Sequence, residues 1–162
     1  MKFIVDSMLG KLARWLRLAG QDVIYANDFP PTAESQDESL LLRAKEDYRI
    51  LLTRDLELHR QAISRRLKSI YLEDDDVVNQ LVEVSNHCEE DVRIDLTDSR
   101  CPVCNGELNQ VGKEEVSGRV PENLLEEHED FWICMDCGKI YWPGTHWETI
   151  AKIAEEYEEK LG

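Results

Sequence analysis

The sequence predicts an α/β protein built on a parallel sheet and followed by a small cysteine-rich module. Short apolar segments alternate with segments of helical periodicity over residues 3–85, which is the pattern of strand–helix–strand units with parallel strands. Two Cys-x-x-Cys motifs follow after residue 100. Of the 162 residues, 42% are hydrophobic and 33% are charged, a composition typical of a soluble globular chain with its own core.

The first two predicted strands flank a helix. The apolar segment at residues 3–5 stops at Asp6, and apolar residues then recur at the spacing of one helix face over residues 9–19. Residues 23–25 form the second apolar segment, and Pro30-Pro31 predicts a loop after it. This part of the chain is therefore expected to begin a parallel sheet.

Two further strands complete the predicted sheet, at residues 50–52 and 70–72. The run Ser35-Gln-Asp-Glu38 fits a capping box and is expected to open a helix that extends to about Asp47. Helices are also predicted after the third and fourth strands, at residues 56–67 and 77–85. Helices between all the strands are expected to flank both faces of the sheet.

The pattern changes near residue 95, where Gly, Asn and charged residues begin to dominate. We therefore expect two domains, residues 1–96 and residues 97–162. A second capping-box candidate, Thr145-His-Trp-Glu148, predicts a helix at the end of the second domain.

The charge is strongly negative, with 19 basic and 34 acidic residues and a net charge of −15. Taken alone, this argues against non-specific wrapping of nucleic acid. Residues 43–68 nevertheless carry eight Lys or Arg against four Asp or Glu, so a basic face is compatible with the sequence. The apolar runs are far shorter than the roughly 20 residues of a membrane-spanning helix, and the N-terminal run stops at Asp6. We expect a cytoplasmic protein without a membrane partner.

Four of the five cysteines form the two motifs, and together they supply the tetrahedral thiolate set that zinc prefers in structural sites. The predicted zinc ligands are Cys101, Cys104, Cys134 and Cys137. Asn105-Gly106 and Gly138 allow backbone conformations in which amide N–H groups turn toward the sulfurs. The spacing between the motifs also resembles that of rubredoxins, so iron stays open as an alternative metal. Cys88 lies outside both motifs and is expected to be a half-buried thiol.

Several carboxylates follow the predicted strands. Asp6 and Asp55 come directly after apolar segments, at the carboxyl edge where open α/β sheets bind ligands. Asp37 lies in the first turn of a predicted helix, and Asp74 comes after the fourth strand. Converging carboxylates repel one another unless a hard cation such as Mg²⁺ or Mn²⁺ neutralises them, and such an ion can activate water toward a phosphodiester. The alternative is that these residues only cap strands and turns.

Cations surround this predicted edge. Lys11, Arg14 and Arg17 step by three along the first helix, and Arg54 adjoins Asp55. Cations of this kind bind phosphates outside a metal site. We therefore expect these four residues to contact nucleic acid, with an ordinary solvated helix face as the alternative.

The motifs together resemble a known family. The runs Asp6–Arg17, Leu52-Thr-Arg-Asp55, Arg100–Gly106 and Cys134–His146 are similar, in the same order, to the PIN-like ribonuclease domain at the C-terminus of Mut-seven-type exonucleases. The resemblance covers nearly the whole chain. It implies a PIN-like parallel sheet flanked by helices, with a zinc ribbon, and the activity of a metal-dependent ribonuclease.

The resemblance also implies roles for single residues. Carried over by position, the catalytic carboxylates are Asp6, Asp37, Asp55 and Asp74. Asp75 and Asp28 are alternatives to Asp74 for the fourth position, and Glu38 is an alternative to its neighbour Asp37. The implied function is hydrolysis of single-stranded RNA with Mg²⁺ or Mn²⁺ held by these acids, while the zinc is structural. The alternative is a non-catalytic module that binds RNA or the ribosome, and the partners expected besides RNA are the ribosome or RNA-processing proteins.

Overall fold

Four short strands form the parallel sheet that the alternating pattern predicts. The computed structural model describes residues 1–29, 35–88, 92–95 and 98–161, so the loop expected at Pro30-Pro31 lies outside the described residues. The elements of this first part are β1 (Lys2–Val5), η1 (Ser7–Leu9), α1 (Gly10–Leu18), β2 (Asp22–Tyr25), η2 (Ala26–Asp28), α2 (Gln36–Glu46), β3 (Ile50–Thr53), α3 (Leu56–Ser64), β4 (Ser69–Tyr71) and α4 (Val77–His87). The strand order is β2-β1-β3-β4, and every pairing is parallel.

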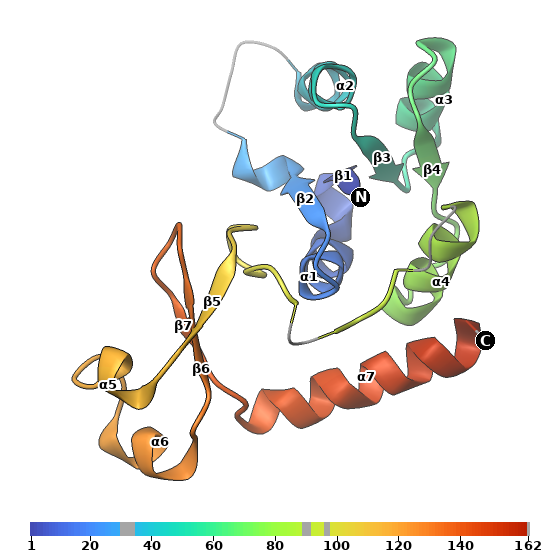
Figure 1. Cartoon of the computed structure of the whole chain (residues 1–162). Helices are drawn as coiled ribbons and strands as arrows, with labels where there is room; N and C mark the ends of the chain where they lie inside the picture. Colours follow the sequence, from blue (N-terminus) through green and yellow to red (C-terminus); the bar gives the residue numbers. More distant parts are fainter. Residues whose placement is uncertain (30–34, 89–91, 96–97, 162) are drawn as a thin grey trace.

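Helices cover both faces of this sheet (Figure 1). Because successive strand residues point to opposite faces, Phe3 packs in one core cluster while its neighbour Ile4 packs in the other. The cluster of Phe3 joins the sheet to α1 and α4, and the cluster of Ile4 joins it to α2 and α3. The sheet is therefore the middle layer of a three-layer α/β body, as the sequence predicts.

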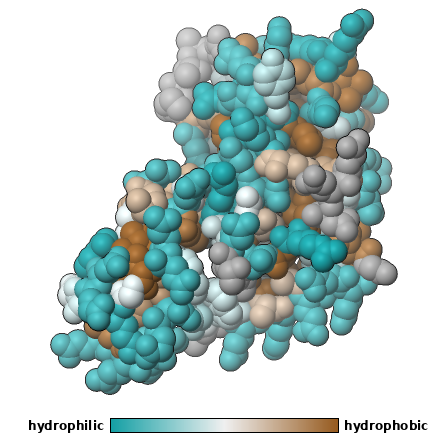
Figure 2. All heavy atoms as spheres, in the orientation of Figure 1, coloured by the Kyte–Doolittle hydropathy of each residue, from teal (hydrophilic) through white to brown (hydrophobic). Residues whose placement is uncertain are grey.

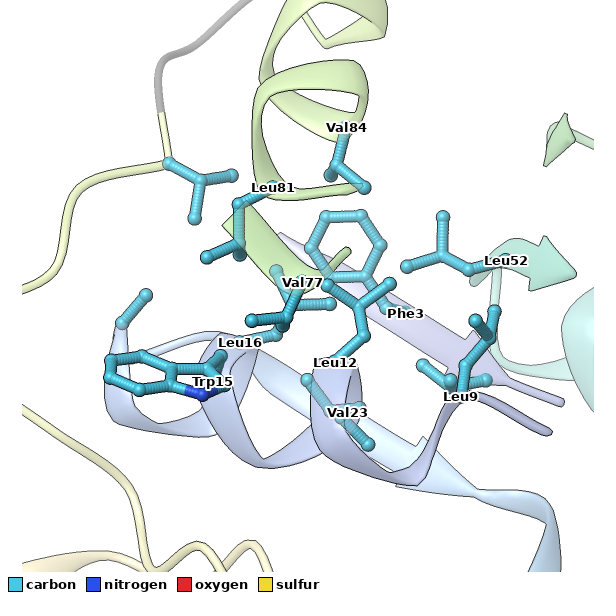
Figure 3. Packing of buried hydrophobic residues seen from close by; sticks show 14 of the residues in the cluster. Phe3, Leu9, Leu12, Trp15, Leu16, Val23, Leu52, Val77, Leu81 and Val84 are labelled. Carbon is cyan, nitrogen blue, oxygen red and sulfur yellow. The ribbon is translucent and has the colours of Figure 1, made fainter. Parts of the chain in front are cut away.

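The larger core cluster fixes the position of α1. Leu12 and Leu16 of α1 are fully buried and lie beside Phe3 and Val23 of the sheet and Leu81 of α4 (Figure 3). These are the apolar positions whose helical spacing predicts α1. The opposite side of α1 is thus left to face the second part of the chain.

The cysteine-rich part forms a second, antiparallel sheet of order β5-β6-β7. Its elements are β5 (Leu108–Val111), α5 (Lys113–Val116), α6 (Glu122–Glu127), β6 (Phe131–Cys134), β7 (Ile140–Tyr141) and α7 (Thr145–Leu161). We refer to residues 98–144 as the ribbon. The ribbon lies beside α1 and β2, and α7 leads from it back beneath the α/β body (Figure 1).

Helix α7 completes the core of the first part. Tyr157 is fully buried in the cluster of Phe3, where its hydroxyl shares a hydrogen bond with Ser85 of α4 and donates to the carbonyl of Val92. The expected division at residues 96 and 97 falls outside the described residues. The division into two domains stays a prediction. Helix α7 belongs to the second predicted domain, yet its Tyr157 packs in the core of the first.

Helix α3 is shorter than the sequence predicts. The helix expected over residues 56–67 ends at Ser64, because Arg66 adopts a left-handed conformation with φ of 62°.

The surface agrees with the composition. On the face drawn in Figure 2 most residues are hydrophilic, in keeping with the charge content. Within the described ranges, no helix has the length and apolar character needed to span a membrane.

Candidate functional site

Asp6 and Asp55 meet at the carboxyl edge of the sheet through the hydroxyl of Thr53. Asp6 follows β1 and is only 5% exposed; its Oδ1 accepts the N–H of Ser7 at 2.7 Å and its Oδ2 accepts the Thr53 hydroxyl at 2.9 Å. The same Thr53 oxygen accepts the N–H of Asp55 at 2.9 Å. The ends of β1 and β3 are therefore joined by one hydroxyl, which holds the two acids at fixed positions.

Asp55 uses one oxygen to begin α3. Its Oδ1 accepts the N–H groups of Glu57 and Leu58 at 3.0 and 3.3 Å, which is the usual bonding of a helix N-cap. Within the described part of the chain its second oxygen accepts no hydrogen bond. The N-cap role and a role in binding a cation are thus compatible for this carboxylate.

Asp37 is the third acid at this edge. It lies in the first turn of α2, whose N-cap Ser35 accepts the N–H of Glu38 as the capping box predicts. Burial raises the pKa of Asp37, and the negative charges of Asp55 and Asp6 raise it further. The structure therefore brings Asp6, Asp37 and Asp55 within electrostatic reach of one another.

The donor set at this edge suits a hard divalent cation. It consists of carboxylate oxygens alone, and their mutual repulsion is what a cation would relieve. Among the described residues, only the four cysteines form a group whose ligand atoms all lie within 4.8 Å of one another. The carboxylates at the sheet edge do not form such a group, so a Mg²⁺ or Mn²⁺ ion held there stays a prediction.

The candidates for the fourth acid are engaged elsewhere. Asp74 accepts the N–H of Asp76 at 2.8 Å and the side-chain amide of Asn79 at 3.0 Å, so both of its oxygens shape the loop before α4. Asp28 pairs with Arg17 at 3.0 Å. Asp75 is exposed. A fourth acid at this edge remains a prediction.

The four cations expected to contact nucleic acid divide into two groups. Lys11, Arg14 and Arg54 are exposed, and Arg54 donates to the carbonyl of Glu73 at 3.3 Å. Arg17, in contrast, is only 3% exposed. Arg17 therefore does not present its guanidinium to solvent in this structure.

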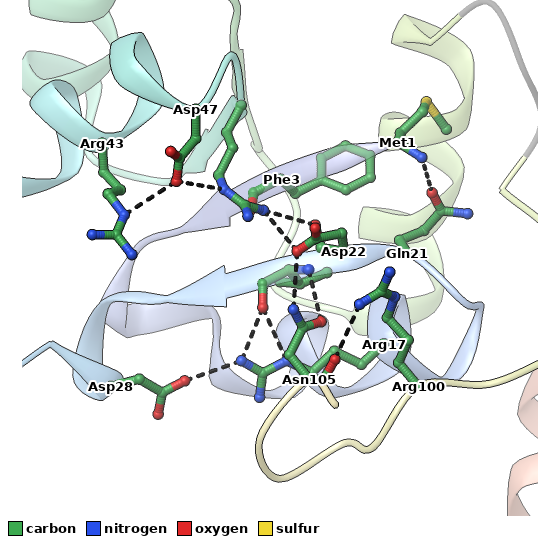
Figure 4. A network of polar contacts seen from close by, with 12 residues as sticks. Met1, Phe3, Arg17, Gln21, Asp22, Asp28, Arg43, Asp47, Arg100 and Asn105 are labelled. Carbon is green, nitrogen blue, oxygen red and sulfur yellow. Dashed lines mark hydrogen bonds and ion pairs between the residues drawn. The ribbon is translucent and has the colours of Figure 1, made fainter. Parts of the chain in front are cut away.

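Arg17 instead joins three parts of the protein, and Figure 4 shows its pairing with Asp28. Its Nε and Nη2 atoms donate to the carbonyl of Val23 at 3.2 and 3.0 Å, while Nη1 donates to the carbonyls of Pro102 and Val103 at 3.1 and 3.3 Å. Its ion pair with Asp28 completes the set. A helical wheel places Arg17 beside the apolar face of α1, but it does not show that the first cysteine motif packs over that position.

Asn105 attaches the same motif to β2. Its side-chain oxygen accepts the N–H of Val23 at 2.9 Å, and its amide donates to Asp22 at 2.9 Å. Asp22 also pairs with the buried Arg49 at 2.9 Å. Burial raises the pKa of Asp22, but the hydrogen bonds from Arg49 and Asn105 outweigh this and leave that pKa lowered. Sequence reasoning gave Asn105 only a backbone role, and its side-chain bonds leave no separate signal in a single sequence.

We expect Arg17→Met to destabilise the fold by about 2–4 kcal/mol, because it leaves buried carbonyls without donors. Arg14→Met, on the exposed side of the same helix, is the matched control and should change the free energy of unfolding by about 0.5 kcal/mol or less. Urea unfolding of both variants measures the difference. Equal effects of the two substitutions would contradict a structural role for Arg17.

The four cysteines converge as their spacing predicts. The Cys101 and Cys137 sulfurs are 3.9 Å apart, and those of Cys104 and Cys134 are 3.3 Å apart. Sulfurs bound tetrahedrally to one zinc ion lie about 3.8 Å apart, so this arrangement fits a structural zinc site. The spacing does not distinguish zinc from iron, because both take four thiolates.

Backbone N–H groups surround these sulfurs. Gly106 and Cys137 donate to the sulfurs of Cys104 and Cys134, each at 3.4 Å. The left-handed φ values of Asn105 and Gly138, 73° and 76°, allow these tight turns, as expected. A Cβ atom on Gly106 would lie 2.8 Å from the sulfur of Cys134, so this position has no room for a side chain.

The surroundings of the sulfurs shift the pKa values of the cysteines in different directions, and burial raises the pKa of Cys104 to about 12. Burial raises the pKa of Cys134, but the N–H groups of Cys137 and Asp136 counteract this and lower it to about 7. Tyr141, one of the aromatic residues that follow the second cysteine motif in the sequence, places its hydroxyl 3.0 Å from the sulfur of Cys101. Burial and the neighbouring cysteines raise the pKa of Tyr141, so its phenol stays neutral and can donate to a thiolate. Cys88 is half-buried and lies outside this cluster, as expected.

Comparison with known proteins bears on both sites. No curated protein and no solved structure matches this chain significantly. A family model described as the Mut7-C RNAse domain matches residues 1–154, a range that includes the carboxylates at the sheet edge and all four clustered cysteines. The chain therefore belongs to the Mut7-C RNAse domain family.

Proposed function

We propose that this protein hydrolyses phosphodiester bonds of single-stranded RNA with Mg²⁺ or Mn²⁺ bound at the carboxyl edge of its parallel sheet. Membership in the family supports a ribonuclease-type function with RNA as the substrate. The observation that carries the proposal is that Thr53 joins Asp6 and Asp55 at the ligand-binding edge of the α/β sheet, near enough to Asp37 for both charges to raise its pKa. Such repulsion is expected where a cation is to be bound.

The three carboxylates have different parts in this mechanism. Asp6 is held from both sides by Ser7 and Thr53, and Asp55 presents its second oxygen from the start of α3. Asp37 accepts no hydrogen bond within the described part of the chain, so its carboxylate is available to a cation and its water ligands. When bound, a divalent cation lowers the pKa of a water molecule and offsets charge on the phosphate. The protein residues hold this arrangement in place.

The exposed cations at this edge are proposed to bind RNA phosphates. Lys11 and Arg14 lie on α1, which begins four residues after Asp6, and Arg54 directly precedes Asp55. We do not include Arg17, because its guanidinium is buried against backbone carbonyls and Asp28. The four-cysteine cluster has no open position for substrate when it holds a metal, so its proposed role is structural.

The test is cleavage of a labelled single-stranded RNA with and without added Mn²⁺ or Mg²⁺. We expect wild type to cleave only with the added cation, and Asp6→Asn combined with Asp55→Asn to bind RNA without cleaving it. The control combines Glu114→Gln with Glu115→Gln, which removes two exposed charges on α5 of the ribbon, and it should cleave normally. RNA binding without any cleavage by wild type would replace the nuclease proposal with that of a non-catalytic RNA-binding module.

A further inference from the structure

A cleft with a volume of about 660 Å³ lies between α1, the ribbon and the first turns of α7. It is lined by all four tryptophans of the chain, Trp15, Trp132, Trp142 and Trp147. Tyr141 lines it as well. The volume is in the range of clefts that hold small organic groups. We name it the α1–ribbon cleft, and the function proposed above does not account for its aromatic lining.

These aromatic side chains are not simply the core of the ribbon. That core is occupied by Phe131 and Val116, which are both fully buried. Trp132 follows Phe131 on β6 and therefore points to the other face of that strand, where it is only half-buried. Its ring stacks on that of Trp147, with centroids 6.0 Å apart and planes inclined by 19°. Both residues line the cleft.

Trp142 is held in a fixed position by its neighbour. A Cβ atom on Gly144 would lie only 3.0 Å from the indole nitrogen of Trp142, which shows how closely the ring packs on the backbone. Trp142 remains half-buried rather than covered. An aromatic ring that is fixed and partly exposed can stack on a flat ligand at little cost in conformational entropy.

The charges around the cleft are unlike those of the rest of the molecule. The chain has a net charge of −15, yet the described residues that line the cleft include three cations, Lys11, Arg14 and Lys139, and no acidic side chain. Lys139 lies over the ring of Tyr141, 5.7 Å from its centroid. In the described part of the chain neither Lys11 nor Arg14 has an ion-pair partner. Flat apolar surfaces combined with unpaired cations complement the bases and phosphates of nucleic acid.

Helix α1 links the cleft to the proposed catalytic edge. Lys11 lies in the first turn of α1, which follows Asp6 and the short helix η1. The cleft residues Arg14, Trp15 and Leu18 continue along the same helix, away from that edge. An RNA strand whose phosphate is at Asp6 therefore has a path along α1 into the cleft.

We propose that the α1–ribbon cleft binds unpaired nucleotides of the RNA substrate, with bases stacked on Trp142 and Trp132 and phosphates at Arg14 and Lys139. The proposal rests on the function proposed above, because it assigns a second contact region for the same substrate. It also gives the ribbon a role in substrate binding: its β6–β7 hairpin supplies one wall of the cleft. Paired bases cannot stack in this way, so the cleft would select single strands over duplexes.

Binding of a fluorescein-labelled, unstructured RNA of about 12 nucleotides to the full-length protein tests this. It is measured by fluorescence anisotropy without added Mg²⁺ or Mn²⁺, so that cleavage does not interfere. We expect Trp142→Ala to weaken binding on the order of 10-fold. We expect Arg14→Gln with Lys139→Gln to weaken it similarly and to reduce the slope of log K against log salt by about 1.4, for two lost phosphate contacts. RNA should also quench the tryptophan fluorescence of wild type, because Trp132 and Trp142, the proposed stacking partners, are half-buried and line the cleft.

Matched controls are available outside the cleft. Tyr48→Ala removes an aromatic ring that is 90% exposed, and Lys45→Gln removes an exposed cation in the last turn of α2. Both should bind RNA as wild type does. Lys139→Gln changes an exposed side chain of the cleft that the nuclease proposal does not use, so it tests the cleft proposal even if Trp142→Ala does not fold, as its circular dichroism would show.

The outcomes separate this proposal from that of the nuclease. If the cleft variants lose RNA affinity but wild type cleaves no RNA, the cleft proposal stands and the nuclease proposal fails. If wild type cleaves RNA and the cleft variants bind it with unchanged affinity and salt dependence, the cleft proposal is wrong and the nuclease proposal stands. Equal affinity of wild type for the single strand and its duplex would also overturn the proposal of stacked bases.

Discussion

Asp37→Asn is expected to lower the rate of RNA cleavage at least about 100-fold while leaving the metal-free protein as stable as wild type or slightly more stable. The loss of rate follows if Asp37 helps to hold the catalytic cation. The gain in stability, up to about 1 kcal/mol, follows because Asn relieves the repulsion that Asp55 and Asp6 exert on this position. If Asp37 only capped a helix or packed against its neighbours, the substitution would lower the free energy of unfolding instead, because it would remove stabilising contacts.

The pH dependence of the free energy of unfolding tests the same repulsion in a second way. Burial and the charges of Asp55 and Asp6 raise the pKa of Asp37 above its ordinary value of 3.8, so the folded protein binds this proton more tightly than the unfolded chain does. The stabilisation from protonation is thus fully present below pH 3.8 and is lost as the pH rises through the raised pKa. Asn does not titrate. The stability of the variant relative to wild type should therefore increase with pH over this range.

Urea unfolding between acidic and neutral pH, without added Mg²⁺ or Mn²⁺, measures this difference, and the cleavage assay measures the rate. The control is Glu38→Gln, in the same turn of α2, because Glu38 pairs with Arg65 rather than with the acids at the sheet edge. Its cleavage rate should equal that of wild type. A destabilised Asp37→Asn that still cleaves RNA would show that Asp37 is a structural residue.

The sequence predicted most of the parallel body because its evidence was local. Strands as short as β1 and β3 are marked by uninterrupted apolar residues, and α1 is marked by its helical spacing. The meeting of Asp6 and Asp55 could be inferred as well, because parallel strands end at the same edge of a sheet. The cysteine cluster followed from the two short motifs, whose ligand spacing is characteristic of tetrahedral thiolate sites.

What the sequence did not show is how the two parts of the chain pack on each other. Arg17 looked like one of three successive cations on an exposed helix face, because helical spacing indicates the direction of a side chain but not its neighbours. Its bonds to Pro102 and Val103 join residues 85 and 86 positions apart. Asn105 likewise bonds to Val23, far away in the sequence, and Tyr157 of α7 packs in the same core cluster as Phe3. Contacts between residues so distant in sequence leave no pattern in one chain alone.

The identity of the fourth acid was unresolved for a different reason. Asp74, Asp75 and Asp76 follow β4 in succession, and a one-residue change of position in a loop alters where each side chain points. The structure gives Asp76 the N-cap position of α4 and directs both oxygens of Asp74 to loop and helix donors. The carboxylates that act on Asp37 are those of Asp55 and Asp6, which come from positions adjoining the strands themselves.

The second large effect is expected at the cysteine cluster. Cys104→Ser should abolish metal binding and unfold the β5–β6–β7 sheet, because folded structural zinc sites derive on the order of 10 kcal/mol from the metal. That sheet has little else to stabilise it: among its described strand residues, only Phe131 and Cys134 are buried. The metal content of the purified proteins, near-ultraviolet circular dichroism and urea unfolding measure the change. The metal content also decides between zinc and iron.

Cys88→Ser is the matched control, because Cys88 is the one cysteine outside the cluster and is only half-buried. It should keep one metal ion and near wild-type stability. The parallel body has its own core, so Cys104→Ser should lose the ribbon before it loses the four parallel strands. The bonds of Arg17 to the first motif and of Asn105 to β2 would loosen with the ribbon. If Cys104→Ser instead kept the metal and the ribbon signal, the four sulfurs would not be the metal site. If it lost the metal but kept the ribbon, contacts with α1 and β2 would be sufficient to hold the ribbon in place without the metal.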